Sequence, residues 1–275
     1  MAAGPRSAEM VRVAAVADVH CSHNCPGTLL PLFNQIAQAA DVLALCGDLT
    51  DYGHPDEAQA LIKELSSIKL PTVAVLGNHD YESDKAAEIR AIFTDAGITT
   101  LDGEVTEIHG VGFAGVKGFC GGFGRGTLSA WGEPVIKEFV KEAINEAVKL
   151  ETALTRLDTR HKIVLMHYAP IRATIEGEPL EIFPFLGCSR LEEPLNRFEV
   201  TAVVHGHAHG GAPEGETSTG VPVYNVSLPV MKKHFPDRPP FRVINVPVER
   251  APGAVTRAPL TTESTAPPVE TRVSS

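Results

Sequence analysis

Residues 72–80 read TVAVLGNHD, an apolar run that ends abruptly in a glycine and three polar residues. A short apolar run of this kind is typical of a strand that is buried on both faces of a sheet. The same arrangement occurs in four other stretches: VRVAAVADVH (11–20), DVLALCGD (41–48), KIVLMHYAP (162–170) and TAVVHGHAH (201–209). A further buried strand is expected at VPVYNVS (221–227). Together with the segments between them, these strands predict an α/β protein.

Amphipathic helices are expected in the segments that separate these strands. Their apolar residues recur on one face with the helical period. The expected helices cover residues 29–40, 55–68, 84–96 and 133–157. Ser189 and Glu192 have the spacing of a capping box, which predicts one more short helix.

The rest of the chain gives weaker signals. Residues 98–126 alternate like antiparallel strands around Asp102 and Gly103 and then become rich in glycine. Residues 171–188 lack a clear period and are expected to form an insertion loop. We expect one domain over residues 10–247. The Pro/Thr/Ala-rich tail, 248–275, has few apolar residues to bury and is expected to be disordered.

The overall composition is that of an ordinary globular protein, with 43% hydrophobic residues and a net charge of −10. This charge argues against non-specific binding to anionic membranes or to large nucleic acids. No apolar stretch approaches the roughly 20 residues that span a bilayer, and Asp18 interrupts the N-terminal apolar run too soon for a secretory signal. We therefore expect a cytoplasmic protein and leave its oligomeric state open.

The five cysteines form an odd and scattered set, which does not suggest a disulfide framework. Cys21 and Cys25 flank His23 closely enough to suggest a zinc knuckle, but no second ligand pair of matching spacing follows. We therefore expect reduced thiols in loops and in the core.

The polar residues at the strand ends are the main functional signal. Ligands of open α/β sheets bind beyond the carboxyl ends of the strands, so these five polar clusters are expected to converge on one site. Their metal-capable side chains are Asp18, His20, Asp48, Asn78, His167, His207 and His209. Seven ligands are too many for one tetrahedral zinc ion and suit two divalent ions. Carboxylate and imidazole donors accept Mn, Fe or Zn.

Each of these residues also has a plainer explanation when it is taken alone. Asp18 and Asp48 could cap helices, Asn78 and Asp80 fit turns, and His167 could be a hydrogen-bonded core histidine. Five such coincidences at five strand ends are much less probable than one shared site.

The strand-end motifs resemble those of the calcineurin-like metallophosphoesterase superfamily. Its pattern D-x-H, G-D, G-N-H-D/E, H and G-H-x-H matches, in order, Asp18–His20, Gly47–Asp48, Gly77–Asp80, His167 and Gly206–His209. The resemblance extends over residues 11–210. It implies a four-layer α-β-β-α sandwich, in which two mixed sheets are flanked by helices.

The resemblance also implies a role for each motif residue. One metal ion would be held by Asp18, His20, Asp48 and His209. The other would be held by Asp48, Asn78, His167 and His207, so that Asp48 bridges the pair. His79 resembles a histidine that contacts the phosphate and assists the leaving group, and Asp80 would orient its imidazole.

Four other residues lie outside these motif roles. His205 lies on the same face as His207, but both ligand sets are already filled, so we expect it to make a structural hydrogen bond. Asp51 is expected in a turn or cap. In the glycine-rich run, Arg125 is the candidate for binding a substrate phosphate, and Lys117 is the weaker one.

The function expected from the sequence is that of a dinuclear metal-dependent phosphoesterase. It would hydrolyse a phosphomonoester or phosphodiester of a small molecule or nucleotide through a metal-bound hydroxide. Two alternatives stay open. One is a non-catalytic binding scaffold of the same fold, although such a protein should have lost ligands or His79. The other is a dinuclear metallohydrolase that acts on a non-phosphorus ester.

Overall fold

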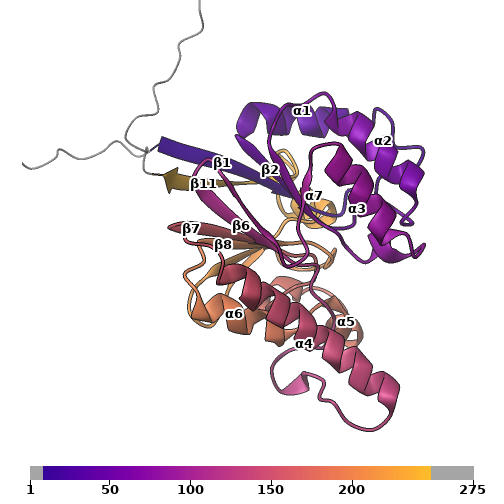
Figure 1. The fold of residues 1–275 in the computed structure, drawn as a ribbon, viewed down its shortest axis with the longest axis vertical. Helices are drawn as coiled ribbons and strands as arrows, with labels where there is room; N and C mark the ends of the chain where they lie inside the picture. Colours follow the sequence, from indigo (N-terminus) through magenta and orange to yellow (C-terminus); the bar gives the residue numbers. More distant parts are fainter. Residues whose placement is uncertain (1–8, 249–275) are drawn as a thin grey trace, which may run out of the picture.

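The computed structural model describes residues 9–248. In this range two β-sheets pack face to face, and helices cover the outer face of each sheet (Figure 1). The expected tail lies outside the described residues, except that Val248 is the last residue of the final strand. None of the described helices has the length and apolar character needed to cross a membrane.

The first sheet has the strand order β11-β1-β2-β3-β4. Strands β1 to β4 are parallel, and β11 pairs antiparallel with β1. The strands are β1 (Glu9–Val16), β2 (Val42–Cys46), β3 (Thr72–Val75), β4 (Thr99–Thr100) and β11 (Arg242–Val248). Because neighbouring strands are parallel, β1, β2 and β3 all end at the same edge of this sheet.

The second sheet has the strand order β5-β6-β7-β8-β10-β9. Its four central strands are parallel, and an antiparallel strand lies at each edge. The strands are β5 (Val105–Ile108), β6 (Val111–Gly115), β7 (His161–Leu165), β8 (Ala202–His205), β9 (Glu214–Glu216) and β10 (Pro222–Asn225). Both sheets are therefore mixed, as expected from the sequence.

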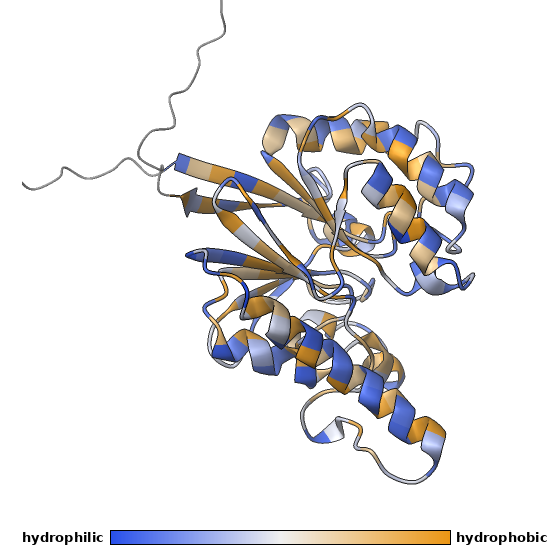
Figure 2. Ribbon diagram, viewed as in Figure 1, coloured by the Kyte–Doolittle hydropathy of each residue, from blue (hydrophilic) through white to orange (hydrophobic). Residues whose placement is uncertain are grey.

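Helices complete the outer layers of the sandwich. The first sheet is covered by α1 (Leu30–Ala39), α2 (Pro55–Leu65) and α3 (Ala86–Asp95), with α7 (Leu228–His234) beside them. The second sheet is covered by α4 (Pro134–Leu154) and α6 (Glu192–Arg197). Figure 2 shows apolar residues along the central strands and on the helix faces turned toward them. The predicted fold, two mixed sheets flanked by helices, is confirmed.

Alternate side chains of each central strand pack in different layers of the sandwich. In β2, Leu43 and Leu45 pack with the helices, whereas Ala44 packs between the two sheets. In β7, Val164 packs with the helices and Leu165 between the sheets. Because side chains on a strand alternate between faces, a strand covered on both sides must be apolar throughout. This requirement explains the unbroken apolar runs in the sequence.

Some expected elements differ from the structure. The antiparallel hairpin of β5 and β6 turns at His109 and Gly110 rather than at Asp102 and Gly103. The earlier strand β4 instead pairs parallel with β3. The turn was misplaced because Asp-Gly is the stronger local hairpin signal.

The expected insertion loop contains short helical turns. These are η3 (Arg172–Ile175), η4 (Leu180–Ile182) and α5 (Phe183–Leu186), followed by η5 (Ser189–Leu191). The predicted capping box at Ser189 is wrong, because its hydroxyl accepts a hydrogen bond from the backbone N–H of Gly124 instead. Two further turns, η1 (His79–Tyr81) and η2 (Gly124–Gly126), follow β3 and β6.

The expectation of reduced thiols holds for three of the five cysteines. Cys46, Cys120 and Cys188 are free and buried. Cys21 and Cys25 form a disulfide within the loop that follows β1, which corrects that expectation. Their Cα atoms are 5.2 Å apart, a usual separation for a disulfide. Spacing alone did not reveal it, because the pair closes only a local loop.

Candidate metal centre

The seven predicted ligands all lie just beyond the ends of five parallel strands. Asp18 and His20 follow β1, Asp48 follows β2 and Asn78 follows β3. In the second sheet, His167 follows β7, and His207 and His209 follow β8. The expected convergence of strand ends is therefore present, with each sheet contributing one side of the site.

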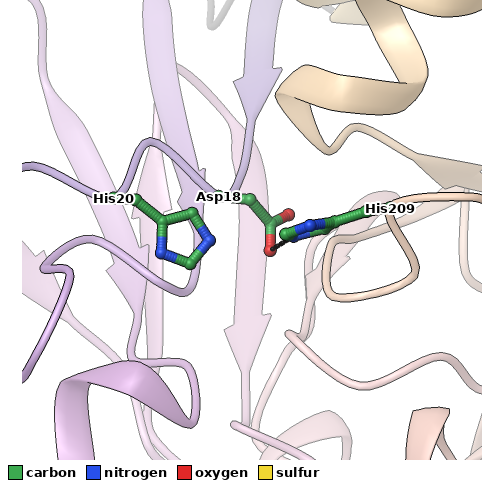
Figure 3. Close-up of side chains that lie close together, drawn as sticks. All are labelled: Asp18, His20 and His209. Carbon is green, nitrogen blue, oxygen red and sulfur yellow. Dashed lines mark hydrogen bonds and ion pairs between the residues drawn. The ribbon is translucent and has the colours of Figure 1, made fainter.

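Asp18, His20 and His209 form the first cluster (Figure 3). One potential ligand atom from each residue lies within 4.8 Å of those from the other two. The Asp18 carboxylate is buried, and its Oδ1 atom is 3.0 Å from Nε2 of His209. In Figure 3 the imidazoles of His20 and His209 lie on opposite sides of this carboxylate.

Asp48, His167 and His207 form the second cluster. Oδ1 of Asp48 is 3.2 Å from Nε2 of His167. The same His167 nitrogen is 2.9 Å from Oδ1 of Asn78, which brings the amide into the cluster. The rings of His167 and His207 have centroids 4.8 Å apart.

Asp48 connects the two clusters. Its Oδ2 atom is 3.7 Å from Nε2 of His20, while its Oδ1 atom faces His167. Three of the four ligands predicted for each ion are thus grouped directly, and Asp48 belongs to the second group while also facing His20 of the first. This placement is compatible with a bridging carboxylate, although the ligand roles themselves stay a prediction.

The backbone of the site is strained at the predicted ligands. Asp18, His20, Asp48 and His207 all have positive φ, between 41° and 68°. Non-glycine residues adopt this conformation at an energetic cost, and such strain concentrates at functional sites. Four of the six described non-glycine residues with positive φ belong to this one site.

Two glycines allow the ligand carboxylates to approach the backbone closely. A Cβ atom on Gly77 would lie 2.2 Å from Oδ1 of Asp48, and one on Gly206 would lie 2.3 Å from Oδ2 of Asp18. Neither position has space for a side chain. The glycine before Asn78 and the glycine before His207 are therefore required by the packing of a carboxylate against each strand end.

Two carbonyl groups determine which nitrogen of each second-cluster histidine would keep its proton when the ring is neutral. Nδ1 of His167 lies 3.1 Å from the carbonyl oxygen of Cys46, and Nε2 of His207 lies 3.2 Å from that of Phe185. A neutral imidazole that donates through one nitrogen presents a lone pair on the other. These contacts leave Nε2 of His167 and Nδ1 of His207 as the potential ligand atoms, a usual arrangement for metal-binding histidines.

The charges of the two clusters shift the pKa values of their members. Burial alone would lower the pKa of His167, but the adjacent Asp48 carboxylate raises it to about 9. Although burial opposes it, the interaction with His167 holds the pKa of Asp48 well below its ordinary value. Burial lowers the pKa of His207 to about 4. Without a metal ion, the second cluster therefore keeps its proton on His167.

The chemistry of the donor set fits divalent cations. Both ring nitrogens of His20 are buried without a hydrogen-bond partner, although they face Asp48 and Asp51. No lysine or arginine side chain in residues 9–248 forms an ion pair with Asp18 or Asp48. Unpaired nitrogens beside two buried carboxylates are costly unless a cation binds between them. All donors are nitrogen or oxygen, which suits Mn, Fe or Zn.

His79 lies at the edge of this centre and is partly exposed. Its backbone N–H donates to Oδ1 of Asp48, and its ring Nδ1 is 2.6 Å from the carbonyl oxygen of Asp51. Nε2 is the nitrogen that faces the centre, 4.0 Å from Oδ2 of Asp48. The ring is therefore oriented by contacts at Nδ1.

Asp80 does not orient His79, so that prediction is wrong. Its buried carboxylate accepts hydrogen bonds from the N–H groups of Leu49, Thr50 and Gly77 and from the Thr50 hydroxyl. Burial raises the pKa of Asp80 to about 6. Asp80 thus joins the loop after β2 to the loop after β3, and it supports Asp48 and Asn78 through the backbone.

Asp51 has a place in the site that sequence reasoning missed, since it was expected only in a turn or cap. Besides its carbonyl contact with His79, its Oδ1 atom is 3.6 Å from Nδ1 of His20. His20, Asp51 and His79 also form a third group with metal-ligand spacing. The available signal was the spacing of Asp48 and Asp51, which places two carboxylates in one short loop.

The structure distinguishes His205 from the other histidines of its motif. His205 is completely buried, with Nε2 2.8 Å from the Thr174 hydroxyl and Nδ1 2.8 Å from the carbonyl oxygen of Gly206. Because both nitrogens have partners, His205 has a structural hydrogen-bonding role, as expected. Arg125 is exposed in η2, and no contact between Arg125 and the centre is found within the described residues.

The geometry agrees with comparisons to known proteins. The model of one family, described as calcineurin-like phosphoesterase, matches residues 11–211. No curated protein sequence matches significantly.

Several solved structures share the fold. Phosphopantetheinyl hydrolase (PptH) from Mycobacterium tuberculosis has a TM-score of 0.62 at 14% identity, over 84% of this chain and 95% of that one. TT1561 of Thermus thermophilus has a TM-score of 0.51 at 18% identity, and the match covers 86% of this chain and 99% of that one. GAP50 is described as the anchor in the inner membrane complex of Plasmodium. It has a TM-score of 0.51 at 14% identity, and the match covers 81% of this chain and 73% of that one.

Proposed function

This chain belongs to the calcineurin-like phosphoesterase family, and on that premise we propose that it is a phosphoesterase that depends on two divalent metal ions. Its substrate would be a phosphomonoester or phosphodiester of a small molecule. The observation that carries the proposal is the position of Asp48, whose two carboxylate oxygens face His20 on one side and His167 on the other.

The residues present could hold both ions. Asp18, His20, Asp48 and His209 would hold one ion, and Asp48, Asn78, His167 and His207 would hold the other. When bound, such a pair neutralises charge on a phosphoryl group and lowers the pKa of a coordinated water. Mn, Fe and Zn are all compatible with this set of ligands.

Two protein contacts prepare the second cluster for an ion. Once neutral, His167 and His207 would each keep a proton on the nitrogen that faces the carbonyl group of Cys46 or Phe185, which leaves Nε2 of His167 and Nδ1 of His207 as potential ligand atoms. Since ligand imidazoles must be neutral, His167 would release its proton when an ion binds. Because the pKa of His207 is low, its ring is neutral near pH 7, the form that binds a metal ion.

His79 is the candidate general acid. Its Nδ1 donates to the Asp51 carbonyl oxygen, and the carboxylate of Glu82 lies 3.6 Å from the same nitrogen. With its Nδ1 held by these contacts, an imidazolium at His79 would direct its Nε2–H toward the centre, where it could donate that proton to the leaving oxygen.

The proposal competes with a binding scaffold, because one fold relative is described as an anchor. The presence of every predicted ligand and of His79 favours an enzyme. A dinuclear hydrolase of a non-phosphorus ester would use the same residues. Substrate profiling separates these possibilities.

The test is turnover of a panel of phosphomonoesters, phosphodiesters and carboxylate esters. The protein is first treated with a chelator and then reloaded with Mn²⁺, Fe²⁺ or Zn²⁺. We expect no phosphoester hydrolysis after chelation and recovery with at least one metal. Two bound ions without turnover of any ester would support the scaffold, and turnover of carboxylate esters alone would support the other hydrolase.

A further inference from the structure

A cavity of about 250 Å³ is lined in part by chain neighbours of the candidate metal centre. Its walls include the apolar side chains of Leu76, Ala86 and Leu101, the ring of Tyr81 and the cationic side chains of Arg90 and Lys117. The carboxylate of Asp102 also lines the cavity. An apolar interior with two cationic side chains and one carboxylate can accommodate an organic anion.

The cavity is built on the same strand ends as the centre. Leu76 directly precedes Gly77 and Asn78, and Tyr81 belongs to η1, which begins at His79. On the opposite sheet, the backbone carbonyl of Lys117 accepts a hydrogen bond of 3.0 Å from the N–H of His167. Residues of the cavity and ligands of the centre are therefore neighbours on both sheets.

Lys117 is held among aromatic rings. Its Nζ atom lies 4.9 Å from the ring centroid of Phe119, 5.3 Å from that of Tyr168 and 5.4 Å from that of Tyr81. The Tyr168 ring in turn packs against His207, with centroids 4.5 Å apart. The ammonium group is thus one aromatic side chain away from the second cluster.

Lys117 differs from the other charged groups of the cavity because it has no ion-pair partner among residues 9–248. Arg90 pairs with Glu104 at 2.7 Å, and Asp102 pairs with Lys149 at 3.0 Å. For Lys117, the hydrogen bond found within residues 9–248 goes to the carbonyl oxygen of Gly118, and no carboxylate lies within 4.0 Å of its Nζ atom. The carboxylates of Glu146 and Glu142 act on Lys117 only from a greater distance. A partly buried ammonium without a direct ion pair is costly, and an anionic ligand would offset that cost.

We propose that Lys117 and this cavity bind a second anionic group of the substrate. The substrate class is therefore a phosphoester that carries an additional phosphate or carboxylate, joined to the scissile phosphate by an apolar or aromatic spacer. The spacer lies against Leu76, Leu101 and Tyr81. This inference rests on the proposed function, since the scissile phosphate occupies the metal centre.

Binding of non-hydrolysable probes to the metal-loaded, full-length protein tests this subsite directly. Calorimetry compares methylphosphonate with alkane bisphosphonates and phosphonocarboxylates of increasing spacer length. At least one probe with two anionic groups should bind roughly 10- to 100-fold more tightly than methylphosphonate, the usual effect of a charge-assisted contact. Comparing the two probe series shows whether phosphate or carboxylate is preferred.

Variants of Lys117 test whether this residue causes the preference for probes with two anionic groups over methylphosphonate. Lys117→Met retains the aliphatic stem between the aromatic rings and should abolish the preference while methylphosphonate binding stays unchanged. Lys117→Arg should keep it. Lys141→Met, which changes an exposed lysine on α4, is the matched control and should behave like the unmodified protein. Circular dichroism and melting temperatures verify folding, and Lys117→Gln provides a second neutral variant.

The results separate this inference from the proposed function. An equal preference for two-anion probes in Lys117→Met and the unmodified protein would overturn the subsite, even if phosphoesters are hydrolysed. A preference that depends on Lys117 would support the subsite even if no ester is hydrolysed, in which case the enzymatic proposal alone fails. Absence of any preference in the unmodified protein would also overturn the subsite.

Discussion

Asp48 and His167 lie on different sheets, and their side chains approach to 3.2 Å between Oδ1 and Nε2. Asp48 follows β2 of the first sheet, and His167 follows β7 of the second. The contact therefore exists only when the two sheets are packed through their shared apolar layer, which includes Ala44 and Leu165. Formation of the metal centre is thus coupled to formation of the sandwich core.

Replacing Asp48 should affect both metal ions. In Asp48→Asn, the side chain keeps its shape but loses the charge that faces His20 and His167. We expect metal content to fall from about two ions per chain to less than one, since a bridging carboxylate contributes to both sites. Elemental mass spectrometry after dialysis measures this change, with Asp158→Asn on the exposed surface as the control.

Asn78→Ala should have a more selective effect. Asn78 contacts His167 and belongs only to the second cluster. We expect one ion to be weakened and the other retained. Equal loss of both ions in Asn78→Ala and Asp48→Asn would contradict the division into two clusters.

Replacing His79 should separate metal binding from chemistry. The first and second clusters do not include its imidazole, whereas its Nε2 atom faces the centre. For His79→Ala we expect full metal content and a kcat reduced roughly 10²- to 10⁴-fold, the range for loss of a general acid. Activity assays with matched metal analysis test this, and His234→Ala at the exposed end of α7 is the control. Loss of metal together with activity would argue against the role of His79 as an acid.

Asp80 should matter more for stability than for the orientation of His79. Asp80→Ala removes the acceptor for the buried N–H groups of Leu49, Thr50 and Gly77. Each unsatisfied buried donor costs about 1–3 kcal/mol, so we expect the free energy of unfolding to fall by about 3 kcal/mol or more. Urea unfolding measures this loss.

Two further variants make that measurement decisive. Asp80→Asn keeps one acceptor oxygen and should lose less stability than Asp80→Ala. Asp95→Ala, at the exposed end of α3, should unfold like the unmodified protein. If Asp80→Ala proves as stable as Asp95→Ala, the carboxylate does not connect the two loops.

The sequence predicted those parts of the centre that depend on local pattern. Each predicted ligand follows an apolar run within a few residues, and parallel strands place such residues at a common edge. For this reason a single amino-acid sequence was enough to predict that Asp18, Asp48, His167 and His207 lie in the centre. The structural hydrogen-bonding role of His205 was inferred differently, because both predicted ligand sets were already filled.

The contacts between loops could not be predicted from the sequence. Asp80 follows His79 in the chain, yet its carboxylate points to the N–H groups of another loop, and a backbone carbonyl of Asp51 orients the ring instead. Backbone groups have no residue-specific signal in the sequence. Likewise, the glycine-rich surroundings of Arg125 favoured it as the phosphate ligand, whereas Lys117 lines the cavity. Such contacts depend on the spatial arrangement of segments that are distant in sequence.

The pair of Asp48 and His167 should give the metal-free protein a characteristic pH dependence. The pKa of His167 is raised to about 9 in the folded protein, above its value of about 6.5 when unfolded. The folded state therefore binds this proton more tightly, and the resulting stabilisation is fully present below about pH 6.5 and is lost as pH rises through about 9. Urea unfolding of chelator-treated protein should show this loss, and His167→Gln should lack it.

Metal affinity should show the opposite pH dependence to the stability of the metal-free protein. A ligating imidazole must be neutral, so an ion at the second cluster competes with the proton on His167. Metal affinity should therefore increase as pH rises toward about 9, over the range in which the metal-free protein loses stability. Titration with Mn²⁺ at several pH values, monitored by calorimetry, measures both the affinity and the proton released. An affinity independent of pH would mean that His167 is already neutral in the metal-free protein, because only a proton bound before the ion arrives can be displaced by it.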